Sequence, residues 1–111
     1  MLLTITEITD EIVRLLRDDP VRPEIPVLDR INGNSRVYML KQDDQAQAVT
    51  CVKFLDAVPA TVQDLDGAPT RATTAVFYTI WSYKPGAGRD LIIMATRSIE
   101  TEFPHITTYV T

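Results

Sequence analysis

The sequence predicts an α/β fold: a single layer of mixed, mostly antiparallel sheet flanked by helices. A helix-period stripe near the N-terminus precedes two β-type runs separated by a short polar segment. A long apolar run at 74–82, a Gly-Ala-Gly turn, a helical pattern and a last β-type run follow. Such a strand–helix–strand unit normally returns to a parallel neighbouring strand. With 111 residues the chain is expected to form one domain, 1–111.

The first element is expected to be a helix over residues 4–18. Its apolar residues recur at helical spacing on one face: Ile5, Ile8, Ile12, Leu15 and Leu16. Thr4 and Glu7 have the spacing of a capping box, which would start the helix, and Pro20 would end it. The connection that follows is predicted to contain one short helical turn around Val27–Ile31.

Residues 36–41 and 48–55 are expected to pair as an antiparallel hairpin, since β-branched and other apolar residues recur in both runs. The polar segment Gln42–Gln45 predicts a loop longer than the tightest turns. Asp43 and Asp44 within it are interpreted as a solvated turn.

The second half of the chain begins with a short helix expected at Pro59–Leu65 and a turn at Asp66–Pro69. Residues 74–82 are apolar on both faces, which predicts a central strand that is covered on both sides. A helix is predicted over 89–102, and Pro104 stops it before a last strand at 105–110.

The sequence SYKPGAGRDLI joins the apolar strand to the second helix. A helix N-terminus exposes unpaired backbone N–H groups and a partial positive charge, and glycines let an anion approach them. Gly86, Ala87, Gly88 and Arg89 would supply these amides, while Lys84 and Arg89 would supply positive charge. An ordinary strand-to-helix turn is the alternative, because one Gly-x-Gly is a weak signal.

Gly86, Gly88 and Leu91 match the pattern R/Q-x-x-G-x-G/A-x-x-L, with Tyr83 at the position of the Arg or Gln. This pattern and the order of elements resemble the GCN5-related N-acetyltransferases. The resemblance implies that the loop amides hold the pyrophosphate of acetyl-CoA and that the pantetheine arm lies in a V between this strand and the next. The cofactor-binding residues that it implies are Thr79, Ile80, Trp81, Ser82, Tyr83, Lys84, Gly86, Ala87, Gly88 and Arg89.

Residues 74–111 also resemble the coenzyme-A-binding half of malonyl-CoA decarboxylases. The resemblance is carried by the run at 75–80, by Pro85-Gly86 and by Glu102-Phe103-Pro104 before a Thr-rich strand. In both families the catalytic elements continue beyond the last strand. The resemblance therefore implies an acetyltransferase-like fold truncated after its fifth strand, with no catalytic residue assigned.

Two functions follow from these resemblances. The first is an acyl-CoA-binding, N-acyltransferase-like protein that transfers the acyl group of acetyl-CoA or another acyl-CoA directly to an amine. The second is a catalytically silent module of the same fold, for example a phage virion component. It would pair as a homo-oligomer, or with another protein, through an open strand edge at 105–111.

Composition and charge argue against several other classes. A net charge of −4 does not favour a nucleic-acid-binding surface. No run of 18 apolar residues predicts a membrane span, and the N-terminus lacks the features of a signal peptide. A cytoplasmic location is expected, with a virion as the alternative. Cys51 is interpreted as a buried, inert thiol and His105 as a solvated loop residue, Ser82 has no evident base, and no metal site is predicted.

Overall fold

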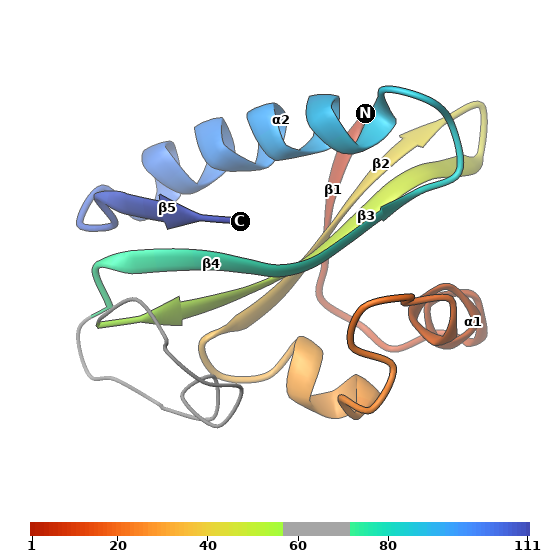
Figure 1. Cartoon of the computed structure of the whole chain (residues 1–111), viewed down its shortest axis with the longest axis horizontal. Helices are drawn as coiled ribbons and strands as arrows, with labels where there is room; N and C mark the ends of the chain where they lie inside the picture. The colour runs from red at the N-terminus through yellow and green to blue at the C-terminus, as the bar shows by residue number, and fades with distance from the viewer. Residues whose placement is uncertain (57–71) are drawn as a thin grey trace.

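The computed structural model describes residues 1–56 and 72–111, which form a five-stranded sheet in the order β1–β2–β3–β4–β5. Its elements are β1 (Leu2–Ile5), α1 (Asp10–Arg17), the 3₁₀ helix η1 (Val27–Arg30), β2 (Ser35–Gln42), β3 (Gln45–Leu55), β4 (Thr74–Ser82), α2 (Ala87–Glu102) and β5 (Thr108–Val110). Helix α2 lies on one face of the sheet, and α1 and η1 lie on the other (Figure 1). Strands β4 and β5 are parallel and the other neighbours antiparallel, which confirms the predicted mixed sheet.

The prediction of a helix over residues 4–18 is wrong in its first half. Leu2–Ile5 form β1, which pairs with Val37–Leu40 of β2. Helix α1 begins after Thr9, whose hydroxyl accepts a hydrogen bond from the backbone N–H of Ile12 at 3.2 Å, so Thr9 is the N-cap in place of Thr4. Pairing with β2 satisfies the backbone groups of Leu2–Ile5, and this long-range pairing outweighs the local helical spacing.

The β2–β3 hairpin is confirmed, but its loop is shorter than expected. Only Asp43 and Asp44 connect the strands, and both have positive φ angles of 52° and 63°. Such angles are those of the tight turn that matches the twist of two paired strands. Asp43 and Asp44 are exposed, as expected for a solvated turn.

The strand–helix–strand unit at the C-terminal end is confirmed, and β4 and β5 pair in parallel over Thr74–Val76 and Thr108–Val110. Helix α2 starts two residues earlier than expected, at Ala87, and β5 starts later, at Thr108. The middle strand is β3, and β4 lies between β3 and β5. The helix and turn expected within 59–69 lie outside the described residues.

Separate apolar cores cover the two faces of the sheet. The core on the α2 side contains Tyr38, Ala48, Val52, Phe54, Ala75, Phe77, Ala87, Leu91, Ala95, Ile99 and Ile106. The core on the α1 side contains Ile12, Leu16, Val37, Met39, Val49, Cys51 and Trp81. Strand β4 contributes to both cores, which explains why its sequence is apolar on both faces.

A buried ion pair joins the connection after α1 to the sheet. Arg30 Nη1 donates to Asp19 Oδ2 at 2.8 Å, and the exposed fractions of the two side chains are 1% and 0%. Asp19 Oδ1 accepts from the Thr79 hydroxyl at 2.6 Å and from the backbone N–H of Arg22 at 3.0 Å. Arg30 also donates to Cys51 Sγ at 3.4 Å and to the carbonyl of Arg22 at 2.7 Å. The network ties residues 19–30 to both β3 and β4.

Removing one partner of this pair should be costly, because the other charge would remain buried without compensation. We expect Arg30→Met to lower the free energy of unfolding by about 3–5 kcal/mol. Lys41→Met is the matched control, since Lys41 pairs with Glu11 at 3.8 Å on the surface. Urea denaturation should show a loss of at most about 1 kcal/mol for the control. Equal losses in the two variants would contradict this account of the buried pair.

The Asp19 carboxyl also predicts how stability depends on pH. Burial raises its pKa, but the hydrogen bonds from Thr79, Arg22 and Arg30 outweigh burial and hold the pKa below the ordinary value of 3.8. The stability it contributes is therefore complete above the unfolded-state pKa and is lost as pH falls through the lower folded-state pKa. We therefore expect the free energy of unfolding to fall less between about pH 4 and about pH 2 in Asp19→Asn than in the unmodified protein. Chemical denaturation at the two pH values measures this difference.

Candidate functional site

The loop between β4 and α2 leaves two backbone amides without acceptors. Gly86 is the N-cap of α2, has a φ of +81° and provides no side-chain cap. The N–H of Ala87 donates to the Lys84 carbonyl at 3.1 Å, and the N–H of Asp90 donates to the Gly86 carbonyl at 3.2 Å. Within the described part of the chain, the N–H groups of Gly88 and Arg89 have no such partner. The start of α2 can therefore donate two hydrogen bonds to a ligand.

Gly88 allows the first turn of α2 to approach the end of β4. A Cβ atom at this position would lie 3.7 Å from Ile80 Cγ2 and 3.8 Å from Ser82 Cβ. These are ordinary contact distances, so alanine fits here, whereas a larger side chain would meet the strand. At Gly86 a Cβ would meet nothing within 4 Å, and the positive φ is the reason for glycine.

Positive charge accompanies the two free amides. Lys84 and Arg89 are exposed, and neither forms an ion pair with another described residue. The positive end of the α2 dipole adds to their field. Asp90 in the same turn is a carboxylate that a bound anion would have to avoid. The donors and charges fit a phosphate group, which accepts hydrogen bonds and carries negative charge.

A β-bulge in β4 decides which predicted residues face this loop. Cys51 pairs with Thr79 but Val52 pairs with Phe77, so Tyr78 is an extra residue in β4. Tyr78 packs against the core on the α1 side, and the next residue, Thr79, also faces that side and donates to Asp19. The alternation of the two faces is reset after this point.

The predicted site residues consequently divide between the two faces. Ile80 and Ser82 lie beneath Gly88, next to Lys84, Gly86, Ala87 and Arg89. Trp81 and Tyr83 face α1: Trp81 Nε1 donates to Tyr83 Oη at 3.0 Å, and Tyr83 Oη donates to Asp18 Oδ2 at 2.7 Å. The Ala87 side chain is buried and its N–H is occupied. Whether any of these residues contacts a cofactor stays a prediction.

The outer edge of β4 is open beside the loop. Its pairing with β5 covers only Thr74–Val76, and no strand of the described part pairs with the outer edge of Phe77–Ser82. Figure 1 shows β5 beside the first part of β4, while the rest of β4 continues beyond β5, paired with β3, toward the loop that leads to α2. The edge of Phe77–Ser82 that lacks a described partner strand lies next to the two free amides, and a V between β4 and β5 stays a prediction.

Other reactive side chains are placed as structural or solvent-exposed groups. Cys51 is completely buried, and burial raises the pKa of its thiol to about 11, which removes it as a nucleophile at neutral pH. Burial also raises the pKa of Tyr78. His105 is exposed, with its ring edge-on to Phe103 at 6.1 Å. No group of three His, Cys, Asp or Glu side chains in the described ranges could hold a metal ion.

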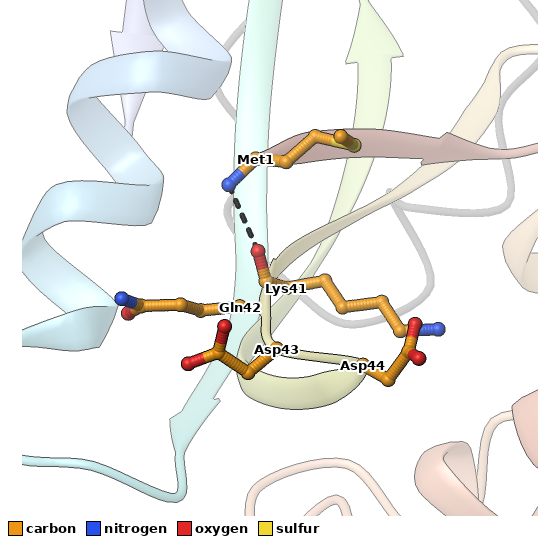
Figure 2. Close-up of a pocket in the computed structure, with 5 residues that line it drawn as sticks. All are labelled: Met1, Lys41, Gln42, Asp43 and Asp44. Atoms are coloured by element: carbon orange, nitrogen blue, oxygen red, sulfur yellow. Dashed lines mark hydrogen bonds between the residues drawn. The ribbon is translucent and has the colours of Figure 1, made fainter.

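A shallow hollow lies at the β2–β3 turn, apart from the loop (Figure 2). Met1, Lys41, Gln42, Asp43 and Asp44 line it. The α-ammonium group of Met1 donates to the Lys41 carbonyl at 2.8 Å, while the carboxylates of Asp43 and Asp44 are exposed. Charges of both signs meet here without a buried polar group, so this hollow has no feature that selects a ligand.

Three residues at the α1 face were not identified from the sequence: Asp18, Asp19 and Arg30. Each acts through a partner more than ten positions away, such as Thr79 for Asp19 and Tyr83 for Asp18. The only local signal was the acidic pair at the end of α1, where the helix dipole favours basic residues. Their partners could be recognised only from the folded chain.

The strand order, the parallel β4–β5 pair and the glycine loop at the start of α2 define an acetyltransferase-like fold. No protein-family model matches the chain, and no curated protein matches it in sequence. Among the described helices, none is both long and apolar enough to cross a membrane.

Solved structures confirm this fold. The malonyl-CoA decarboxylase of Agrobacterium vitis is similar with 22% identity and a TM-score of 0.81, and that of Rhodopseudomonas palustris with 25% and 0.78. Both comparisons cover 98% of this chain but only 32% and 31% of the decarboxylases. A predicted acetyltransferase of Clostridium acetobutylicum, solved with acetyl-CoA, has 15% identity and a TM-score of 0.51, covering 100% of this chain and 80% of its own. The similarity to the decarboxylases thus extends beyond residues 74–111.

The two loop glycines should differ in their tolerance of alanine. Gly88→Ala should leave the free energy of unfolding unchanged or raise it by up to about 1 kcal/mol, because alanine favours the helix and its Cβ fits. Gly86→Ala should lower it by about 1–2 kcal/mol, because the left-handed conformation is unfavourable for alanine. Gly33→Ala is the control, since Gly33 has a φ of +62° and equally open surroundings. Chemical denaturation measures all three; a large loss in Gly88→Ala alone would contradict the geometry.

Proposed function

We propose that this protein binds a coenzyme A thioester, with the pyrophosphate at the start of α2 and the pantetheine arm along the open edge of β4. The observation that carries the proposal is the pair of unoccupied amides on Gly88 and Arg89, directly beside that edge. The Clostridium acetobutylicum protein of the same fold, solved with acetyl-CoA, supports the choice of ligand.

The loop would bind the phosphates through backbone and side-chain groups together. The two amides donate to phosphate oxygens, and Lys84 and Arg89 neutralise charge from the solvent side. The unpaired backbone groups of Phe77–Ser82 can exchange hydrogen bonds with the amide groups of an extended arm, as a sheet edge does with an added strand. When bound, the thioester supplies an acyl group that is activated toward attack by a nucleophile.

Transfer of that acyl group directly to an amine is the reaction that we propose for the bound thioester. Thr74–Ser82 contains no Asp or Glu, so β4 itself supplies no carboxylate to deprotonate the amine. Asp19 is also unsuited to this task, because its carboxylate is buried and fully occupied by donors. The contribution of the described residues is therefore to hold and orient the thioester.

A silent assembly module is the second candidate. One observation favours it: β5 pairs with β4 on one side, and in the described part of the sheet no strand covers its other side. Such an edge can accept a strand from another chain. Assembly requires neither the amides of the loop nor a thioester, so ligand titration separates the two candidates.

Calorimetric titration with acetyl-CoA, malonyl-CoA and free coenzyme A tests the proposed binding. We expect Lys84→Glu and Arg89→Glu each to weaken the affinity at least about tenfold, because each reverses a charge beside the phosphates. Arg97→Glu is the matched control, since Arg97 is exposed on the same helix, two turns further on. It should change the affinity by less than about twofold, as expected for a charge screened by salt at this separation.

Absence of binding at millimolar ligand by the folded, unmodified protein would exclude the proposed function. Equal weakening by Arg89→Glu and Arg97→Glu would show attraction by net charge alone, without a phosphate site at the start of α2.

A further inference from the structure

A chain of two side-chain hydrogen bonds connects the end of β4 to the end of α1. Trp81 Nε1 donates to Tyr83 Oη at 3.0 Å, and Tyr83 Oη donates to Asp18 Oδ2 at 2.7 Å. Asp18 is the C-cap of α1 and lies 65 positions from Tyr83 in the sequence. Tyr83 is the last residue before the loop that presents the free amides of Gly88 and Arg89.

This chain is poorly placed to stabilise the fold as a whole. The side chain of Tyr83 is 47% exposed and Asp18 is exposed as well, so water competes for the hydrogen bond between them. The main chain already holds Tyr83 to β3, because its N–H donates to the Gln47 carbonyl at 2.8 Å. The bond to Asp18 therefore mainly fixes the direction of the Tyr83 side chain at the entrance of the loop.

The loop has few other constraints. No side-chain hydrogen bond is formed by Lys84, Pro85 or Gly86 within the described residues, and all three are exposed. One backbone hydrogen bond, from the N–H of Ala87 to the Lys84 carbonyl at 3.1 Å, closes the loop, and Tyr83 and α2 adjoin its two ends. Three residues, Lys84, Pro85 and Gly86, separate Tyr83 from the first residue of α2.

We propose that Asp18 and Tyr83 are positioning residues of the phosphate site: their hydrogen bond fixes the loop so that Gly88 and Arg89 present their amides in one direction. The inference rests on the proposed coenzyme A binding for its ligand. Its structural part, the control of the loop by Asp18, can be measured without any ligand.

A simpler role for these two hydrogen bonds is to supply an acceptor for the buried indole N–H of Trp81, which is 7% exposed. The two roles respond differently to substitution. Tyr83→Phe removes both hydrogen bonds. Asp18→Ala removes only the bond from Tyr83 to Asp18 and leaves the bond from Trp81 to Tyr83. Asp18→Asn removes the charge but keeps an acceptor oxygen for Tyr83.

The first measurement compares the affinities for coenzyme A and for pantetheine, which lacks the phosphates. We expect Tyr83→Phe and Asp18→Ala each to weaken coenzyme A binding about fivefold and to leave pantetheine binding unchanged, because only the phosphates contact the loop. Asp18→Asn should retain the affinity for coenzyme A. Tyr109→Phe is the control, since its buried hydroxyl has no hydrogen-bond partner among the described residues.

The second measurement is backbone ¹⁵N relaxation of the ligand-free variants. In Asp18→Ala we expect lower order parameters at Lys84, Gly86, Gly88 and Arg89, with the amides of β3 unchanged and Asp18→Asn like the unmodified protein. If the loop loosens in this way but coenzyme A does not bind, the proposed function fails and the positioning role stands. Unchanged order parameters together with unchanged affinity in Asp18→Ala would overturn the positioning role, as would an equal loss of pantetheine binding.

Discussion

Asp19 and Arg30 are charges removed from water, and the arrangement of the α1 face depends on how they are compensated. Burying an ion pair is tolerable only when its remaining donors and acceptors are also satisfied. Here Thr79, Cys51 and the backbone of Arg22 provide those partners, and they belong to β4, β3 and the connection after α1. The same bonds that compensate the charges thus fix the connection and α1 against the sheet, and they commit the Thr79 hydroxyl to this face.

The bulge at Tyr78 determines which side chains at the end of β4 face α1 and which face α2. Because one residue is added before Thr79, Ile80 and Ser82 turn toward α2, and Trp81 and Tyr83 turn toward α1. If β4 alternated regularly through Tyr78 and Thr79, without the bulge, the bulky indole of Trp81 would lie under the first turn of α2, where the contact distances at Gly88 leave space for little more than a methyl group. The approach of α2 to the strand, and hence the position of its amides, follows from a single irregularity in the ladder.

The sequence was sufficient for features that depend on neighbouring residues. The hairpin, the β4–α2–β5 unit and the glycine loop all follow from local periodicity and turn chemistry. The sequence was insufficient for β1, because pairing with β2 overrode a helical pattern. It was also insufficient for the bulge, because a tyrosine at position 78 does not indicate one. Because of that bulge, Trp81 and Tyr83 lie on the opposite face of the strand from Ser82. Asp18 and Asp19 were missed because their partners are 65 and 60 positions away.

The N-cap of α2 is a glycine, which provides no side-chain acceptor for the first turn of the helix. Helices usually begin with a side chain whose oxygen accepts an amide of the first turn, as Thr9 does for α1. Gly86 has no such oxygen, so the first turn of α2 lacks the side-chain acceptor that Thr9 gives to the Ile12 amide of α1. The amides of Gly88 and Arg89 therefore stay free within the described part of the chain. A helix start left open in this way is stabilised either by water or by an acceptor from outside. The open edge of β4 lies beside it, and an elongated ligand with an anionic end can satisfy both sets of unpaired groups at once.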